Sequence, residues 1–286
     1  MPQSFTTSPQ SPLAAPKHRR RSVLVTGAAG NIGSYFAKHS CKRYKLRLLV
    51  HGDEDKTAMQ ALCAWGEKVV GDIRDLEQMT RLFKGIDTVL HLAGDPSPQA
   101  DWNNALNINI VGTFNVFTAA RRAGCRRVVY ASSIHAVSGY PADVQVKTSD
   151  PVNPGDLYGV SKCFGEALAR YMAQQEGLSS IAIRIGAFQS RKIAQQKGGI
   201  NMLDAWVSQR DLSQLIEQCI DDEKLQFAIF NGLSGNRFNR LDISDARELL
   251  GYAPQDDLTE VNPTLKRLGL RKRVQSHNTG DRRKKS

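Results

Sequence analysis

The chain has 286 residues, ordinary apolar and charged fractions, and a formal net charge of +11. This length is enough to bury a sizeable core, as one large domain or a domain with a small appendage. No apolar run approaches the roughly 18 residues that span a bilayer. The composition therefore favours a soluble globular protein without a membrane partner.

The positive charge is concentrated at the two ends. Residues 1–21 contain four Lys/Arg and no acid, and residues 264–286 contain nine against one acid. We predict a disordered basic tail over 1–21 and a second basic tail over 264–286. Solvated tails are the favoured interpretation, whereas nucleic-acid binding and an organelle transit peptide are the less favoured ones. Five scattered cysteines without a CxxC pair predict a reducing, cytoplasmic setting and no metal site.

From residue 22 the chain alternates apolar, β-branched runs with segments of helical periodicity. The expected strands are 22–26, 46–50, one ending at 69–72, 88–92, 127–131 and 181–185. The expected helices are 32–43, 76–84, 107–124 and 156–176. Repeated β-then-α units predict an α/β fold, a doubly wound parallel sheet of the Rossmann type, over residues 22–190.

Beyond residue 190 the pattern weakens. Residues 189–199 are polar and predict a loop, while 212–220 and 242–250 favour helices and 227–230 a strand. We expect residues 191–263 to form a small C-terminal lobe that caps a substrate site.

A glycine turn follows the first expected strand. Gly27, Gly30 and Gly33 suit a tight turn, close approach of backbone to a pyrophosphate, and close packing of helix on strand. The N–H groups at the start of the next helix, at Asn31 and Ile32, favour phosphate. These residues predict a dinucleotide site.

The site for the adenosine half is less regular. An acid that binds the 2′-hydroxyl of NAD is expected at the end of the second strand, and His51 stands there. This substitution slightly favours NADP over NAD, although Asp53 is close enough to serve as the acid. Asp72 and Ile73 are expected at the adenine, with a capping or turn role as the alternative for Asp72.

Tyr158, Lys162 and Ser133 predict proton-transfer chemistry. The spacing of Tyr158 and Lys162 places both side chains on one helix face. A phenol has a pKa near 10, and a nearby ammonium favours its phenolate form. Ser133 would hold a substrate hydroxyl beside the phenol. Asn109 is predicted either to support Lys162 or to be a plain buried structural residue.

Together these motifs resemble the extended short-chain dehydrogenase/reductase family, of the NAD-dependent epimerase/dehydratase type. TGAAGNIG, GDIRD, HLAG, ASSIHAV and YGVSK stand where that family has them. The resemblance implies that Leu92, Ala93 and Gly94 lie in the cofactor site, with Tyr158 and Lys162. It also implies a homodimer that pairs through helices near 107–124 and 156–176.

Residues 157–166 and 184–186 look most like uronate dehydrogenases, which use NAD to oxidise the anomeric carbon of a hexuronate. This likeness implies that Ser133, Ile134 and His135 line the sugar site and that Ala187 lies beside the nicotinamide. The arginine that binds the substrate carboxylate in those enzymes is replaced by Asn201. Arg191 is a candidate substitute, because a guanidinium binds a carboxylate in a bidentate manner.

We therefore expect an NAD(P)-dependent oxidoreductase that takes hydride from a hydroxyl or lactol of a small sugar or sugar acid. Two alternatives remain open at this point. One is a sugar epimerase that retains its NAD. The other is a non-catalytic NAD(P)-binding regulator whose basic tails bind nucleic acid.

Overall fold

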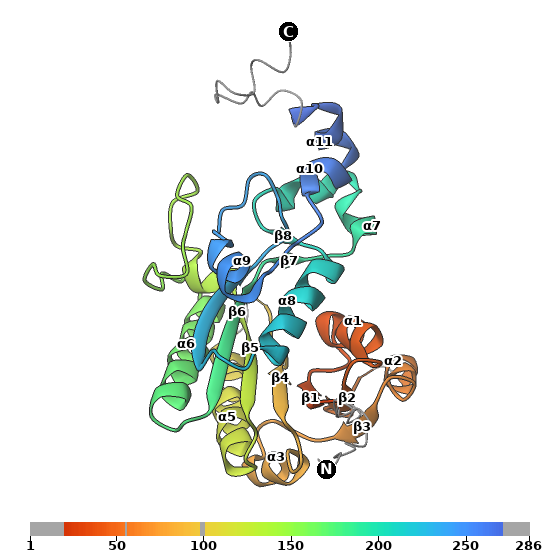
Figure 1. Ribbon diagram of the computed structural model, residues 1–286, viewed down its shortest axis with the longest axis vertical. Coiled ribbons are helices and arrows are strands. Elements are labelled where there is room, and N and C mark those ends of the chain that lie inside the picture. Colours follow the sequence, from red (N-terminus) through yellow and green to blue (C-terminus); the bar gives the residue numbers. More distant parts are fainter. Residues whose placement is uncertain (1–19, 55, 98–100, 271–286) are drawn as a thin grey trace, which may run out of the picture.

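The computed structural model describes residues 20–54, 56–97 and 101–270 (Figure 1). Most of both predicted tails therefore lies outside the described residues. Arg20 and Arg21, which we assigned to the first tail, are placed against the body of the protein. The Arg21 guanidinium lies 3.5 Å from Asp87 and 3.6 Å from Asp221. The ordered body thus begins slightly earlier than expected.

A seven-stranded parallel sheet forms the centre of the described chain. Its strand order is β3-β2-β1-β4-β5-β6-β9, and all neighbouring strands are parallel. Successive strands are added on one side from β1 to β3 and on the other side from β4 onward, so the order switches between β1 and β4. The strands are β1 (Ser22–Thr26), β2 (Lys45–Val50), β3 (Glu67–Val70), β4 (Thr88–His91), β5 (Arg127–Ser133), β6 (Ser179–Ile185) and β9 (Phe227–Gly232). The predicted doubly wound α/β fold is confirmed.

Helices cover both faces of the sheet (Figure 1). They are α1 (Asn31–Ser40), α2 (Lys56–Leu62), α3 (Leu76–Leu82), α4 (Trp102–Asn104), α5 (Thr113–Arg122), α6 (Leu157–Gln174), α8 (Gln209–Asp221) and α9 (Ser244–Leu250). One apolar core joins α1 and α8 to the sheet, through residues such as Phe36 and Leu215. A second core joins α3, α5 and α6 to the opposite face, through residues such as Phe117 and Leu168.

The segment after β6 builds a small layer at one end of the sheet (Figure 1). It contains β7 (Ala187–Phe188), α7 (Arg191–Ala194), the 3₁₀ helix η3 (Lys197–Met202), β8 (Trp206–Val207), α10 (Leu258–Val261) and α11 (Pro263–Arg267). Trp206, which is fully buried, anchors its core. The same segment also supplies β9 to the main sheet. The boundary at residue 190 remains a prediction.

The expected elements differ from the structure in several places, and β7, β8, α10 and α11 were not among them. The long helix expected over 107–124 is preceded by α4 and contains a π-helical stretch, η1 (Ala105–Gly112), before α5 begins. The loop expected over 189–199 was wrong in part, because α7 and the start of η3 lie there. Helix α2 was not anticipated. None of the described helices is long and apolar enough to cross a membrane.

Candidate active site

The glycine turn joins β1 to α1. Gly27 has a φ of +64°, which favours glycine. A Cβ on Gly27 would lie 2.8 Å from the Ala93 nitrogen, and a Cβ on Gly33 would lie 2.4 Å from the Gly27 carbonyl oxygen. Gly30 precedes α1 without a side-chain cap, so the first N–H groups of the helix remain available. The turn therefore has the close backbone approach and positive potential that a pyrophosphate requires.

The Thr26 hydroxyl, which is bonded to the buried His91, holds the loop after β4 against this turn. The Thr26 hydroxyl accepts N–H groups of Leu92 and Ala93, each at 3.1 Å, and lies 2.8 Å from His91 Nδ1. The Thr26 proton is therefore directed to Nδ1, and His91 Nε2–H is left to donate to Thr113 at 3.2 Å. Burial, with a smaller effect of Lys162, lowers the pKa of His91 to about 3, so the ring is neutral at pH 7.

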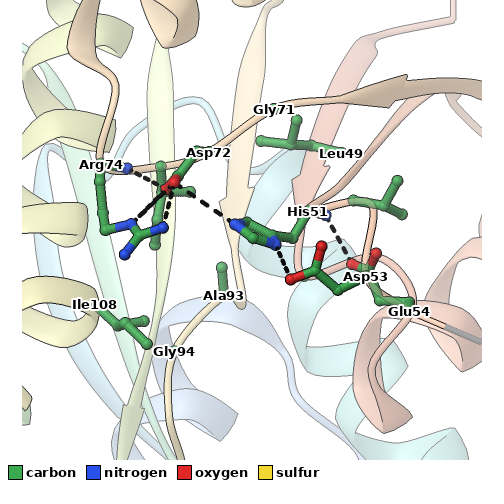
Figure 2. A pocket seen from close by; sticks show the side chains of 13 residues that line it. Leu49, His51, Asp53, Glu54, Gly71, Asp72, Arg74, Ala93, Gly94 and Ile108 are labelled. Atoms are coloured by element: carbon green, nitrogen blue, oxygen red, sulfur yellow. Dashed lines mark hydrogen bonds and ion pairs between the residues drawn. The ribbon is translucent and has the colours of Figure 1, made fainter. Parts of the chain in front are cut away.

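A cavity of about 400 Å³ opens at the ends of β1, β2 and β3. Figure 2 shows His51 between two carboxylates in this cavity. Its Nδ1 lies 2.8 Å from Asp53, and its Nε2 lies 3.5 Å from Asp72. The lining residues are Gly27, Leu49, Val50, His51, Asp53, Glu54, Gly71, Asp72, Ile73, Arg74, Ala93, Gly94 and Ile108.

The pKa values of Asp72 and Glu54 are lowered in this cavity. Hydrogen bonding by Arg74 lowers the pKa of Asp72 to about 2. Burial alone would raise the pKa of Glu54, but backbone N–H groups of His51 and Gly52 outweigh it and lower that pKa. These N–H groups lie 2.7 and 2.6 Å from the Glu54 carboxylate. The cavity therefore presents three carboxylates, and its one guanidinium is bonded to Asp72 (Figure 2).

A second cavity, of about 330 Å³, lies at the ends of β4, β5 and β6 and shares Gly94 with the first. Its lining residues are Ile32, Leu92, Gly94, Pro96, Ala131, Ser132, Ser133, Ile134, His135, Tyr158, Lys162, Ile185, Gly186, Ala187 and Phe188. The carboxyl ends of parallel strands meet at one edge of a sheet, and these residues converge there for that reason.

Tyr158 and Lys162 project into this cavity from α6. The Lys162 amine lies 5.4 Å from the centre of the Tyr158 ring and donates to the Ala131 carbonyl at 2.9 Å. Burial lowers the pKa of Lys162 to about 8. Burial raises the pKa of Tyr158, a hydrogen bond with Ser133 opposes this, and the charges of Asp156 and Asp95 raise it further. The phenol thus interacts with the Ser133 hydroxyl, and the Lys162 amine lies over the phenol ring.

Asp156 starts α6 and also holds His135. One carboxylate oxygen accepts the Gly159 N–H at 2.7 Å, and the other lies 2.6 Å from His135 Nδ1. The His135 ring packs edge-on against Tyr158, with centroids 5.3 Å apart. A single residue thus fixes the position of the phenol and of the imidazole beside it.

Asn109 lies in η1 and is almost fully buried. Its side chain accepts the Asp95 N–H at 2.8 Å and donates to the Asp95 carbonyl at 3.0 Å. It also donates to the Ser161 hydroxyl, 3.2 Å away on α6. Asn109 therefore ties the loop after β4 to the helix of Tyr158. The π-helical stretch, a common feature of functional sites, is what holds this amide.

A buried ion pair supports the floor of the cavity, and the sequence patterns did not single it out. Glu166 forms two 2.9 Å bonds to Arg184, and it accepts the Ser132 hydroxyl at 2.6 Å. The side chains are 3% and 1% exposed. Ser132 pairs with Arg184 in the register of β5 and β6. The available signal was a pair of charged residues inside otherwise apolar, buried elements.

The structure distributes the predicted cofactor residues over both cavities. Gly27, His51, Asp72, Ile73, Ala93 and Gly94 line the first, and Ile32, Leu92, Gly94, Tyr158, Lys162 and Ala187 line the second. Asn31 instead lines a third cavity next to these. Gly30 and Gly33 shape the turn without lining the first two cavities. Glu54, Arg74 and Ile108 are cavity residues that the sequence patterns missed.

The predicted substrate residues divide into two groups. Ser133, Ile134 and His135 line the second cavity. Arg191 and Asn201 do not line it, and their role in substrate binding stays a prediction. Arg191, the first residue of α7, bonds to Asp256 at 3.1 Å and lines a separate cavity, and Asn201 lies in η3.

Comparison with known proteins agrees with this geometry. The model of the NAD-dependent epimerase/dehydratase family matches residues 23–256. An NAD-dependent glucose-6-phosphate dehydrogenase of Haloferax volcanii is 34% identical over 83% of this chain and 94% of its own. An L-arabinose 1-dehydrogenase (NAD(P)(+)) of the same organism is 31% identical, covering 84% of this chain and 98% of its own.

Among solved structures, uronate dehydrogenase from Agrobacterium tumefaciens aligns with a TM-score of 0.75 and 30% identity, over 91% of each chain. The resemblance to this group of enzymes is confirmed. The slight preference for NADP that His51 suggested finds no support in these comparisons, which favour NAD. The chain belongs to the NAD-dependent epimerase/dehydratase family.

Proposed function

We propose that the protein is an NAD-dependent dehydrogenase of a small sugar or sugar acid and oxidises a lactol or secondary hydroxyl. The observation that carries this proposal is the convergence of Tyr158, Ser133 and Lys162 on one cavity, directly beside the glycine turn. The relatives named above are dehydrogenases of sugars, which supports the same reaction type.

Tyr158 is the proposed general base. Its phenolic oxygen takes the proton of the substrate hydroxyl, which Ser133 holds by hydrogen bonding. We assign Lys162, whose amine lies 5.4 Å from the centre of the Tyr158 ring, the role of favouring the phenolate that forms as the proton moves, because opposite charges attract. Asn109 is a positioning residue, since it joins the Asp95 loop to α6. When bound, NAD supplies the hydride acceptor.

The residues of the first cavity and the turn fit a dinucleotide. A Cβ on Gly27 would collide with the backbone of Leu92 and Ala93, and a Cβ on Gly33 with the backbone of the turn, so glycine at these positions lets the turn pack against the loop after β4 and against α1. We assign the pyrophosphate to Gly30, Asn31 and Ile32, at the uncapped start of that helix. Asp72 and Ile73 are assigned to the adenine, as the sequence predicted.

We propose NAD rather than NADP as the cofactor. A 2′-phosphate would enter a cavity that contains Asp53, Glu54 and Asp72. Neither His51 nor Arg74 is free to neutralise it, because both are bonded to these carboxylates (Figure 2). A neutral 2′-hydroxyl, in contrast, finds an acceptor in Asp53. Comparing kcat/KM for the two cofactors tests this proposal, and a preference for NADP would refute it.

Tyr158→Phe tests the reaction. Removing the phenolic oxygen should lower kcat by at least about 100-fold, since general base catalysis contributes 10²–10⁴-fold, while binding of NADH persists. Tyr171→Phe is the matched control, because Tyr171 lies on the same helix but is 48% exposed and bonds Glu176. Turnover that survives Tyr158→Phe would reject the proposed mechanism.

The two alternatives have distinct outcomes. Protein purified with tightly held NAD, which interconverts sugars without added cofactor, would instead be an epimerase. The regulator hypothesis depends on tails that lie mostly outside the described residues. Salt-dependent nucleic-acid binding, lost on truncation of both tails, would favour it if no sugar is oxidised.

We also propose a homodimer through η1–α5 and α6. These helices expose the apolar side chains of Val111, Phe114 and Val160, which are 38%, 45% and 45% exposed. Light scattering of the purified protein measures its mass, and a monomer at micromolar concentration would reject this proposal.

A further inference from the structure

The geometry points to an uncharged aldose, rather than a hexuronate, as the substrate of the second cavity. This inference rests on the proposed dehydrogenase function and specifies its substrate class. Among the described residues, every cationic side chain that lines the cavity already has a bonding partner within the protein, so none is left to pair with a carboxylate. A buried carboxylate without a cationic partner is strongly disfavoured, whereas hydroxyls are satisfied by neutral donors and acceptors.

Of the two basic side chains that line the cavity, Lys162 is bonded within the protein, and His135 is bonded at one ring nitrogen, which leaves a single ring nitrogen for a substrate hydroxyl. Lys162 is 5% exposed, bonds the Ala131 carbonyl and faces the Tyr158 ring. His135 is held at Nδ1 by the carboxylate of Asp156. Neither offers the paired donors with which a guanidinium binds a carboxylate.

Two arginines near this end of the sheet, Arg184 and Arg191, are paired with acids outside the cavity lining. Arg184 is 1% exposed and forms a bidentate pair with Glu166 through Nε and Nη2, while its Nη1 is buried without a hydrogen-bond partner. Arg191 bonds Asp256, which also bonds Arg210 at 2.8 Å in a separate cavity.

Negative charge surrounds the phenol instead. Asp95 stands between Gly94 and Pro96, which both line the cavity, and Asn109 fixes its backbone. The charges of Asp95 and Asp156 both act on the hydroxyl of Tyr158. An anionic substrate would be repelled by both carboxylates as it approached the general base.

The rest of the cavity suits a neutral sugar. Ser133 and His135 provide groups that can bond hydroxyls, and Ile134, Ile185 and Phe188 provide apolar surface for the C–H faces of a pyranose. The cavity of about 330 Å³ also has to receive the nicotinamide, so the space left for substrate favours a monosaccharide over a nucleotide sugar.

Steady-state kinetics on the full chain test the inference. The panel is glucose, galactose, arabinose and xylose against glucuronate, galacturonate and glucose 6-phosphate, with NAD. We expect kcat/KM for the best neutral aldose to exceed that for every anionic sugar by at least about tenfold, the effect of one missing charge-assisted pair. An anionic sugar that is used as well or better overturns the inference and leaves the dehydrogenase function intact. A protein that binds NADH but oxidises none of the sugars refutes the function and the inference together.

Asp95→Asn tests the electrostatic basis with the same panel. Asn retains an oxygen for the Ser97 N–H, which Asp95 accepts at 3.0 Å, but removes the charge. We expect the ratio of uronate to aldose kcat/KM to rise about two- to fivefold at low salt, and the KM for uronate to depend less on ionic strength. Glu77→Gln, which removes the same charge from the exposed surface of α3, should leave both quantities unchanged. An Asp95→Asn ratio equal to that of Glu77→Gln contradicts the inference.

Discussion

The buried pair of Glu166 and Arg184 offers a direct test of how the edge of the sheet at the second cavity is stabilised. Glu166→Gln keeps the size of the side chain and its bond to Ser132 but leaves the Arg184 charge without a partner at 1% exposure. Breaking a buried pair in this way destabilises a protein by about 3–5 kcal/mol. At roughly 2 °C per kcal/mol for a chain of this size, the melting temperature should fall by about 6–10 °C.

Urea unfolding followed by tryptophan fluorescence measures this loss, because Trp206 is fully buried in the folded protein. Glu77→Gln is the matched control. It breaks a pair with Arg122 whose side chains are 71% and 50% exposed, and such pairs contribute only about 0–1 kcal/mol.

The double variant Glu166→Leu, Arg184→Met should be more stable than Glu166→Gln alone, because it leaves no uncompensated charge. A loss below about 1 kcal/mol for Glu166→Gln, or a double variant less stable than the single one, would refute the reasoning. Activity should fall with stability in Glu166→Gln, since Ser132 precedes Ser133 at the end of β5.

Three further predictions concern the cofactor half of the site and pH. Gly27→Ala should abolish NADH binding measured by fluorescence, because the added Cβ meets the Ala93 backbone at 2.8 Å. Gly85→Ala is the control and should bind NADH normally, because Gly85 has a similar φ of +76° but its added Cβ would have no heavy atom of another residue within 4 Å. Asp53→Asn should reduce the preference for NAD over NADP by about tenfold, and an unchanged ratio of kcat/KM values would exclude Asp53 from the ribose site. His91 has a folded pKa of about 3, below its unfolded value near 6.5, so its contribution to stability is present above pH 6.5 and is lost as pH falls towards 3. The free energy of unfolding should therefore decrease over that range, by at most about 1.4 kcal/mol per pH unit for this residue, and His91→Gln should show a shallower decrease.

Local sequence patterns were sufficient to predict the architecture and to propose the residues for the chemistry. β1, β2, β4 and β6 lie within a residue or two of their expected positions, because buried parallel strands are continuous apolar runs. The glycine turn and the Tyr158–Lys162 spacing are local patterns. The first can be interpreted within one strand-turn-helix unit, and the second within one helix face. Ser133, at the end of its strand, followed from the same order of elements.

The ion pairs and hydrogen bonds of the charged side chains around the two cavities depend on the tertiary structure and could not be predicted from local patterns. His51 follows its strand as an apparent cation, but the fold places Asp53 and Asp72 on its two ring nitrogens. Arg191 reads as a partner for a carboxylate, yet α7 aims it at Asp256, 65 residues further along the chain. Periodicity and propensity report on neighbours within a few residues. The partner of a charged side chain is chosen by the packing of distant segments, and the selectivity of a site depends on those partners.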